Sequence, residues 1–412
     1  MSTQENISVL VLSNYMICPP ISGGAKRVLF PAMNFSHDDG VDFSFLFLSF
    51  SEDEISFNQQ FLQALPTVKE AHGVLTTEEF QYDWKNIPKN FSDQVWYTLN
   101  ENYLQAVCEH IRSTNYDIIQ VIHTQFAWIV PFLRKHSDAK IVLDQQNVEW
   151  MVYKRWLPYA KKNDYDRVNN DYITLKSWED TVLSWFDHIL CISPEEVETV
   201  RQMAPKPDVI YAPSGAAIDD RSYHPQSHEN EKPYDLFFIG SMNWYPNAHG
   251  LIWLIDEVFP IILKKRPNTK LEIVGSGKPD DEMLMRIARH KGITFWGSIE
   301  DERPLFHQSK VFVSPVWIGA GVRLKNPTAW AAKLPVVATS LSAEGLLYTD
   351  KKDILIGDNP EDFAAHVLSL LDSPLLREQI ADEAYSTYVK HYSRDNLVEM
   401  WKAIYQRISG RG

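Results

Sequence analysis

Two basic residues, Arg323 and Lys325, follow a short loop that contains Gly319 and Gly321. An apolar run of β-type residues, 311–316, precedes the loop, and a helical segment of small residues, 328–333, follows it. Glycine-rich turns between a strand and a helix expose backbone N–H groups that can bind an anion. Two fixed cations beside such a turn suit a diphosphate. An ordinary strand-to-helix crossover with two solvated bases explains this stretch equally well.

Polar side chains also follow two apolar runs in the N-terminal half. His123 comes directly after the run 118–122, and Asn147 and Glu149 follow the run 141–144. Parallel α/β sheets bind ligands beyond the carboxyl ends of their strands, so these side chains are candidate substrate contacts. The alternatives are a histidine satisfied within its own turn and an asparagine that caps the next helix.

A glycine pair, Gly23 and Gly24, opens a helical segment after the first apolar run, 7–13. Glycines at such a place let the backbone approach a phosphate or a sugar closely. Lys26 and Arg27 come next, and we expect both to lie on a solvated first turn of the helix.

The elements that must position these residues form two successive series of buried strands and helices. A strand, a turn with glycine and a helix, repeated in this order, predict a parallel, doubly wound sheet. The expected strands are 7–13, 43–50, 118–122, 141–144, 188–192 and 208–211 in the first series, and 236–240, 270–275, 293–297, 311–316 and 336–339 in the second. Residues 52–100 show no clear period and predict no element before a helix over 97–113.

Length and composition limit the class of protein. The chain has 412 residues, more than one core usually serves, so we expect two domains. The first expected domain is 1–220, completed by a C-terminal helix at 393–412. The second is 235–392, and 221–234 is the expected linker. The net charge of −14 argues against nucleic-acid binding.

The three cysteines lie far apart in the sequence, which suits a reduced, cytoplasmic compartment. No apolar run approaches the ~20 residues of a membrane span.

Three segments resemble the donor-binding signature of group 1 (family 4) glycosyltransferases: 319–325 (GAGVRLK), 335–339 (PVVAT) and 343–346 (AEGL). The resemblance implies an α/β protein of GT-B fold, with two Rossmann-like, doubly wound parallel-sheet domains facing across a cleft. It also implies retaining transfer of a sugar from a nucleotide diphosphate sugar to a glycan, lipid-linked or other hydroxyl acceptor in glycan or glycoconjugate biosynthesis. Backbone donors and fixed cations can neutralise the departing diphosphate without a metal, so we expect no cofactor.

The resemblance assigns roles residue by residue. His123, Arg323 and Lys325 are the expected catalytic groups, and Asn147 and Glu149 the expected acceptor contacts. The expected donor-binding residues are Gly23, Gly24, Gly240, Ser241, Gly297, Gly319, Gly321, Thr328 and Glu344.

The chain departs from the family pattern at several of these positions. The family usually has two glutamates around the Arg-x-Lys segment, and its second glutamate holds the donor ribose; here Ala320 and Thr328 occupy these places. In many relatives, an arginine and a lysine that bind the β-phosphate follow the position of Gly240. In this chain, Ser241 and Pro246 occupy these places. Arg323 and Lys325 would then be the main cationic contacts.

Alternative functions and contacts stay open. Thr328 also suits a non-catalytic GT-B partner subunit, and a GT-B nucleotide-sugar epimerase would use cleft carboxylates as acid and base. Residues 150–187 interleave tryptophans with basic side chains, which suits either a peripheral membrane contact or sugar stacking, or a core with a solvated face. The pair Asp164 and Asp166 forms a DxD in a charged, helix-like run, where we expect no metal.

Overall fold

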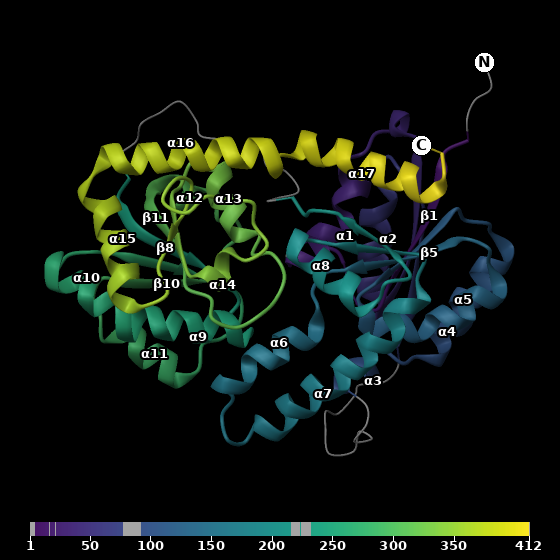
Figure 1. Ribbon diagram of the computed structural model, residues 1–412, viewed down its shortest axis with the longest axis horizontal. Helices are drawn as coiled ribbons and strands as arrows, with labels where there is room; N and C mark the ends of the chain where they lie inside the picture. Colours follow the sequence, from purple (N-terminus) through teal and green to yellow (C-terminus); the bar gives the residue numbers. More distant parts are fainter. Residues whose placement is uncertain are drawn as a thin grey trace. The chain divides into compact units, whose positions relative to one another are not determined.

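The computed structural model describes residues 5–15, 17–20, 22–76, 92–215, 223 and 232–411. The chain divides into two compact units, one formed by 1–214 with 397–412 and the other by 215–396 (Figure 1). Each unit contains one parallel sheet, and these two sheets confirm the predicted pair of Rossmann-like domains. Most of the expected linker, 221–234, lies outside the described residues.

The first sheet has seven parallel strands in the order β3-β2-β1-β4-β5-β6-β7. The strand order reverses beside β1, which pairs with β2 on one side and with β4 on the other. In open α/β sheets such a switch point is where ligands bind. The strands are Ile7–Ser13 (β1), Val41–Ser49 (β2), Val68–Leu75 (β3), Ile118–Ile122 (β4), Lys140–Gln145 (β5), His188–Cys191 (β6) and Asp208–Tyr211 (β7).

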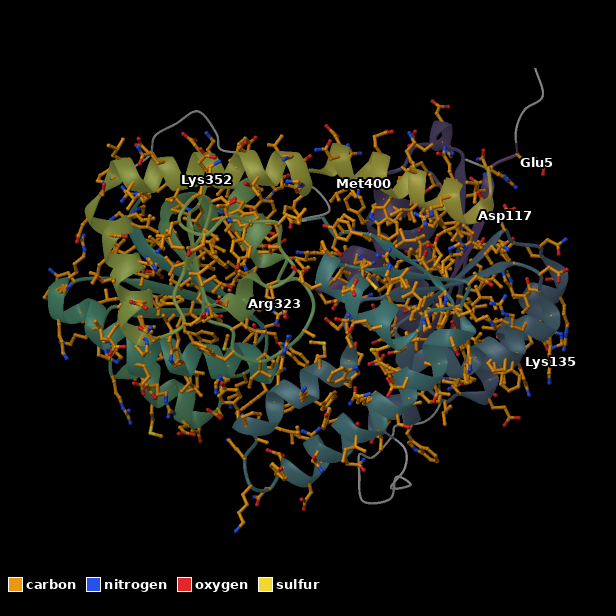
Figure 2. All side chains as sticks on the ribbon, in the orientation of Figure 1. Glu5, Asp117, Lys135, Arg323, Lys352 and Met400 are labelled. Carbon is orange, nitrogen blue, oxygen red and sulfur yellow. The ribbon has the colours of Figure 1, made fainter. Side chains whose placement is uncertain are left out.

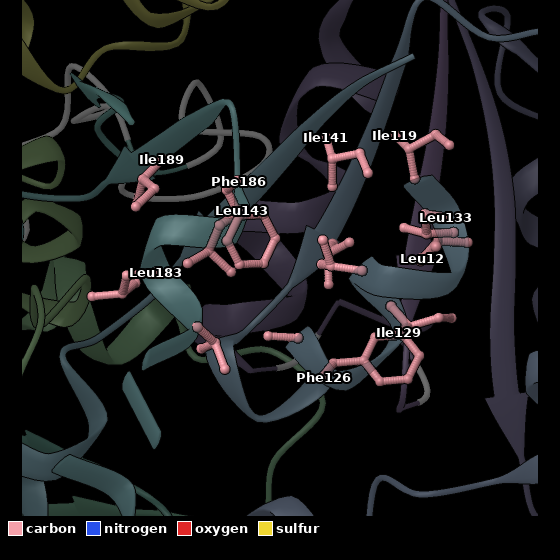
Figure 3. Close-up of a cluster of buried hydrophobic side chains, with 14 of the residues drawn as sticks. Leu12, Ile119, Phe126, Ile129, Leu133, Ile141, Leu143, Leu183, Phe186 and Ile189 are labelled. Carbon is pink, nitrogen blue, oxygen red and sulfur yellow. The ribbon is translucent and has the colours of Figure 1, made fainter. Parts of the chain in front are cut away.

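Alternate residues of these strands are buried on opposite faces of the sheet, as a period of two dictates. Leu10 and Leu12 lie in the cluster of Figure 3, whereas Val9 and Val11 lie in the cluster on the other face. The helices that contribute to the first cluster are Glu101–Ser113 (α4), Val130–His136 (α5), Tyr165–Val182 (α7) and Pro194–Met203 (α8). Those that contribute to the second are Gly23–Asn34 (α1), Glu52–Gln63 (α2) and Arg394–Ser409 (α17).

The last helix, α17, belongs to the first unit from Leu397 onward. Its Trp401 indole donates to the Pro213 carbonyl (3.1 Å), and its Tyr405 hydroxyl donates to Gln120 Oε1 (3.0 Å). After the helix, Arg411 pairs with Asp117 at 2.9 Å and donates to the carbonyl of Glu5, near the start of the chain, at 2.6 Å. Figure 2 labels Glu5 and Asp117. These contacts fix the end of the chain against the sheet that its beginning forms.

No element was predicted from the sequence for the part of the chain that contains α2 and β3. β3 is the edge strand of the sheet, and most of its side chains are partly or fully exposed, so it lacks the apolar run of a buried strand. A short helix, Asp93–Trp96 (α3), lies further on, and residues 77–91 lie outside the described part.

The second sheet has six parallel strands in the order β10-β9-β8-β11-β12-β13. They are Tyr234–Ile239 (β8), Leu271–Val274 (β9), Ile293–Gly297 (β10), Ser309–Ser314 (β11), Val336–Ala338 (β12) and Leu355–Ile356 (β13). Its helices are Tyr245–Trp253 (α9), Phe259–Lys265 (α10), Asp281–Ala288 (α11), Arg303–Gln308 (α12), Lys325–Ala331 (α13), Ser340–Ala343 (α14), Pro360–Asp372 (α15) and Pro374–His391 (α16). Buried clusters cover both faces of this sheet.

The tryptophans of residues 150–187 pack largely against the first core. Trp150, Trp178 and Trp185 contact the cluster of Figure 3. Lys154 and Lys176 lie over the ring of Trp150 at 5.5 and 5.7 Å. This arrangement favours a core with a solvated, basic face. In the described part of the chain, no helix combines the length and the apolar character that crossing a membrane requires.

Candidate functional site

The glycine loop after β11 holds the guanidinium of Arg323. Gly319 and Gly321 have φ values of 131° and 75°, which glycine adopts without strain. A Cβ atom at Gly319 would lie 2.8 Å from Arg323 Nη2, so the loop needs glycine there for space as well. Arg323 Nη1 donates to the carbonyls of Ala320 (2.8 Å) and Gly321. The loop therefore fixes the arginine against its own backbone.

Lys325 is the first residue of α13, three residues earlier than the helix predicted from the sequence. The helix starts early because Pro327 fits within a first turn, where its missing N–H is not needed. Lys325 Nζ donates to the Ile239 carbonyl and to Asn247 Oδ1, each at 3.0 Å, and lies 5.1 Å from the Phe238 ring centre. Burial, and then the charge of Arg323, lower the pKa of Lys325 to about 7.

Asn247 joins this lysine to the turn after β8. Its Oδ1 accepts from Lys325, and its Nδ2 donates to the Ser241 carbonyl at 3.2 Å. A Cβ atom at Gly240 would lie 2.7 Å from Asn247 Cγ, so the glycine lets the asparagine approach. The ends of β8 and β11 are thus brought together around one half-buried lysine, with Gly240, Ser241 and Lys325 in one place.

Two further donor candidates lie around α13 and α14. The Thr328 hydroxyl donates to the Leu324 carbonyl (2.8 Å), a bond within its own helix. Asn326, fully buried, donates to the Ser342 carbonyl (2.7 Å) and so ties α13 to α14. Glu344 follows α14 and is partly exposed. Gly297 ends β10 with a φ of 70° and has open space where a Cβ atom would be.

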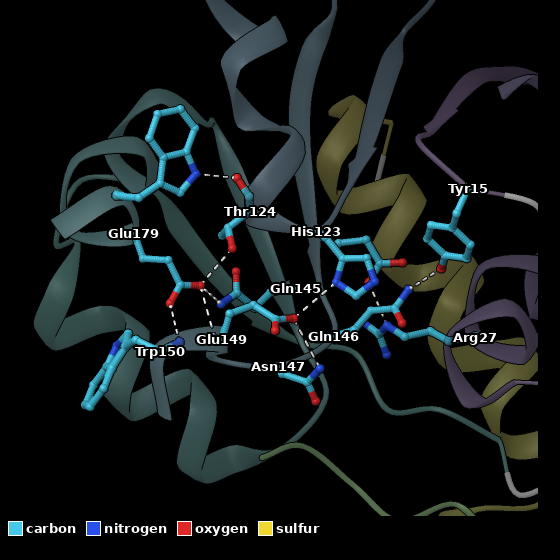
Figure 4. Close-up of polar contacts among 12 residues, drawn as sticks. Tyr15, Arg27, His123, Thr124, Gln145, Gln146, Asn147, Glu149, Trp150 and Glu179 are labelled. Atoms are coloured by element: carbon cyan, nitrogen blue, oxygen red, sulfur yellow. Dashed lines mark hydrogen bonds and ion pairs between the residues drawn. The ribbon is translucent and has the colours of Figure 1, made fainter. Parts of the chain in front are cut away.

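In the first unit, three predicted residues meet at the ends of β4 and β5: His123, Asn147 and Glu149 (Figure 4). We call them the His123 group. His123 has a φ of 66°, a left-handed conformation that costs energy for a residue with a Cβ atom and is typical of functional sites. Its Nδ1 lies 3.4 Å from Glu149 Oε1, and Asn147 Nδ2 donates to the same oxygen at 3.2 Å. Asn147 does not cap α6 (Glu149–Trp156), because the cap residue is Val148, so the capping alternative is wrong.

Glu179, on α7, accepts hydrogen bonds from one residue of the His123 group and from neighbours of the group. Its carboxylate is fully buried and accepts from Thr124 Oγ1 (2.8 Å), from Gln145 Nε2 (3.1 Å) and from the backbone N–H groups of Glu149 and Trp150 (3.3 Å each). It thereby links the residue after His123 to the start of α6. Burial, and then the charge of Glu149, raise the pKa of Glu179 to about 7.

Arg27 is not solvated, which corrects the prediction made for the first turn of α1. It is 2% exposed, and its Nε lies 2.6 Å from Asp144 Oδ1. Its Nη1 donates to the Ala212 carbonyl (2.5 Å) and to Ser214 Oγ (3.0 Å). The physical reason is that Asp144 ends a fully buried strand, where a carboxylate requires a cation. Arginine can satisfy such a carboxylate and neighbouring carbonyls at once.

The glycine pair begins α1, with Ser22 as the cap residue. A Cβ atom at Gly24 would lie 2.4 Å from Gln146 Oε1, so only glycine lets the loop approach the end of β5 this closely. Gln146 Nε2 donates to the Tyr15 hydroxyl (3.3 Å), and the Tyr15 ring lies 5.8 Å from that of His123. Gly24 is therefore packed beside the His123 group, whereas Gly23 is exposed.

Comparison with known proteins matches part of the chain to a family. Residues 233–373, from β8 through α15, match the family described as Glycosyl transferases group 1. The match lies within the second unit and covers less than half of the chain. A curated relative, an uncharacterized 44.6 kDa protein in the cps region of Klebsiella pneumoniae, is 26% identical over 265 residues, which are 62% of this chain and 66% of that protein.

Solved structures share the fold of this protein over nearly its whole length. Sucrose-phosphate synthase from Thermosynechococcus elongatus has a TM-score of 0.74 at 13% identity, covering 99% of this chain and 100% of that one. TarM of S. aureus has a TM-score of 0.71 at 12% identity, covering 97% and 98%. The pneumococcal O-GlcNAc transferase GtfA has a TM-score of 0.67 at 12% identity, covering 98% and 99%. These likenesses confirm the predicted GT-B fold.

The site residues predicted from the sequence divide between the two units of the chain. Within one unit the structure groups His123, Asn147 and Glu149; within the other it groups Arg323 and Lys325 with the turn after β8. Sequence reasoning missed Glu179 and Asn247. A polar residue on a long helix gave no signal for the first. Asn247 could have been found, because it follows Tyr245 and Pro246 at the start of a predicted helix.

The DxD pair occupies a helix start. Asp164 is the cap residue of α7, and Asp166 lies exposed in its first turn. The pair therefore sits on a helix rather than at the end of a strand, as the sequence predicted.

Proposed function

We propose that the protein is a glycosyltransferase that binds a nucleotide diphosphate sugar through Arg323 and Lys325, and that it transfers the sugar with retention and without a metal ion. The observation that carries the proposal is the environment of Lys325 Nζ. Both atoms that accept its hydrogen bonds are neutral oxygens, and the neighbouring charge that lowers its pKa is another cation, Arg323. A half-buried cation held by neutral oxygens gains from an anionic ligand, because a diphosphate would supply a counter-charge that those oxygens do not.

The proposed transfer reaction requires the protein to stabilise charge and does not require a protein nucleophile. As the bond from the sugar to the diphosphate breaks, negative charge grows on the phosphate oxygens, and cations fixed in advance stabilise it. Departure from the same face lets a phosphate oxygen accept the proton of the incoming hydroxyl, so the sugar keeps its configuration. His123 is the proposed contact with the transferred sugar, and Asn147 and Glu149 with the acceptor.

The ribose requires a different contact from the one usual in the family. Thr328 offers one short neutral hydroxyl, which already donates to Leu324. Glu344 lies just beyond α14, which Asn326 ties to α13. We propose that Glu344 accepts from the ribose hydroxyls in place of the missing glutamate.

The neighbours guide the choice of donor. GtfA was solved with UDP and GlcNAc, and HepE of Anabaena with UDP and glucose. The name of the curated relative places it in a cps region. UDP-glucose and UDP-GlcNAc are therefore the first donors to test, and a glycan or lipid-linked hydroxyl is the proposed acceptor, in glycan biosynthesis.

The test is incubation of the protein with single nucleotide sugars, with and without a mixture of oligosaccharides and lipid extract. Phosphorus and proton NMR then follow release of nucleoside diphosphate and the configuration of the new glycoside. We expect release of the diphosphate and a product with the donor's anomeric configuration. An isomerised nucleotide sugar would show an epimerase instead. Absence of both turnover and nucleotide binding would show a non-catalytic subunit.

A further inference from the structure

Three ligand-type side chains meet at the outer edge of the first sheet. Glu70 and His72 are two residues apart on β3, the edge strand, so they point to the same face. His110 lies on α4, which contacts β3. The first two side chains are exposed and the third is partly buried, so the cluster is open to ions from solvent.

The separations are those of a metal site. Glu70 Oε2 lies 3.2 Å from His72 Nε2 and 3.8 Å from His110 Nε2, and all three ligand atoms lie within 4.8 Å of one another. Around a tetrahedral zinc ion with bonds of about 2.0–2.1 Å, two ligand atoms lie roughly 3.3–3.4 Å apart. The two distances from the carboxylate bracket this value, and the His72 side chain is exposed, so it is free of close packing that would prevent its rotation toward an ion.

We propose that Glu70, His72 and His110 bind a divalent transition-metal ion, with Zn²⁺ the best suited. Two imidazole nitrogens and one carboxylate oxygen form a ligand set that zinc accepts, and water completes the coordination. Mg²⁺ and Ca²⁺ prefer oxygen ligands throughout, so this mixed set disfavours them.

Tyr116 shapes the site from its buried side. Its hydroxyl lies 2.6 Å from His110 Nε2, and its ring stacks on the imidazole at 5.7 Å. When that nitrogen binds the metal, the hydroxyl is placed to hydrogen-bond to water on the ion, so the tyrosine keeps a polar partner. The ring contact holds the imidazole in place in both states.

The bound ion would join α4 to the edge strand of the sheet. Edge strands carry backbone groups open to pairing with other chains, and a cross-link to a helix makes such an edge more rigid. An ion that binds the folded unit and not the unfolded chain also stabilises the fold. This inference is independent of the proposed transfer reaction, since none of its residues was assigned to donor or acceptor.

Titration of the untagged, metal-free protein with Zn²⁺ against a chromophoric chelator tests the proposal. We expect one ion per chain, and a loss of affinity of at least about tenfold in both Glu70→Gln and His72→Ala, since even changes outside the ligand set usually weaken a site that much. His366→Ala, which alters a histidine of the other unit, should bind as the wild type does. Both test positions are exposed, so folding should survive, and circular dichroism checks it.

Two outcomes would overturn the site. One is absence of a saturable equivalent of zinc in the wild type; the other is equal affinity in the wild type, Glu70→Gln and His72→Ala. A thermal melt gives a second readout: zinc should raise the unfolding temperature of the wild type and not that of His72→Ala. An equal rise in both proteins would place the ion elsewhere.

Discussion

Binding of a nucleoside diphosphate should transfer a proton to Lys325. Burial and the charge of Arg323 lower the pKa of Lys325 to about 7. With that value, roughly half of the amine is neutral at pH 7 and about 90% at pH 8. An adjacent diphosphate favours the charged form and raises this pKa again. Binding should therefore take up about 0.5 proton at pH 7 and about 0.9 at pH 8, and close to none at pH 6.

The same linkage sets how affinity depends on pH. Above pH 7 each further pH unit should weaken diphosphate binding by close to tenfold, or about 1.4 kcal/mol, until the pKa of the complex is reached. Binding of the nucleoside alone should not change, because it presents no phosphate to Lys325.

Calorimetry measures the proton directly. Titrating UDP at pH 8 in two buffers of different ionisation enthalpy gives the number of protons from the difference in binding enthalpy. At this pH the terminal phosphate, with a pKa near 6, is already ionised and contributes little. Lys325→Arg is the matched control, because a guanidinium stays charged and should reduce the uptake to near zero. Tight binding without proton uptake in the wild type, or equal uptake in Lys325→Arg, would refute the reasoning.

Three further predictions concern metal, ribose and support of the His123 group. Turnover should survive EDTA, and a loss that Mn²⁺ restores would contradict metal-independent transfer. Thr328→Glu should tighten nucleotide binding or leave it intact, as measured by calorimetry, whereas a collapse of binding would mean that the pocket is shaped for another ligand. Glu179→Gln should destabilise the fold by about 1–3 kcal/mol in urea unfolding, because one of the groups that donate to the carboxylate then faces an amide N–H₂. Because the pKa of Glu179 is raised to about 7, the folded state holds a proton that an unfolded carboxyl releases near pH 4.3, so this group's contribution to stability falls as pH rises between these values. Glu179→Gln should remove that part of the pH dependence, and an unchanged profile would contradict it.

The buried strands could be predicted from the sequence because both of their faces are covered. β1 and β4 consist mainly of aliphatic residues, and their bounds agree with the prediction. β3 could not be found this way, because an edge strand that contains Lys69, Glu70 and His72 has no such aliphatic run. Parallel pairing between strands far apart in the chain then follows from the repeated order of strand, turn and helix.

The site residues that follow a strand were predictable for the same reason, since topology brings strand ends together. His123 and Glu149 are examples. Arg27, Glu179 and Asn247 were not, because each acts through a contact with a residue distant in sequence: Arg27 with Asp144 is 117 positions apart. Periodicity indicates which face of a helix is buried, but not which polar group on another element that face will meet.

The central claim is that Arg323 and Lys325 bind the diphosphate of the donor. Its most direct test compares the affinities of UDP and uridine for the wild type, Arg323→Ala and Lys325→Ala, with Lys352→Ala, an exposed lysine paired with Glu383, as the control. Losing a charge-assisted contact should cost about 1.5–3 kcal/mol, so UDP should bind roughly 10- to 150-fold more weakly to both variants while uridine changes little. An equal loss for UDP and uridine, or an equal loss in Lys352→Ala, would contradict the claim.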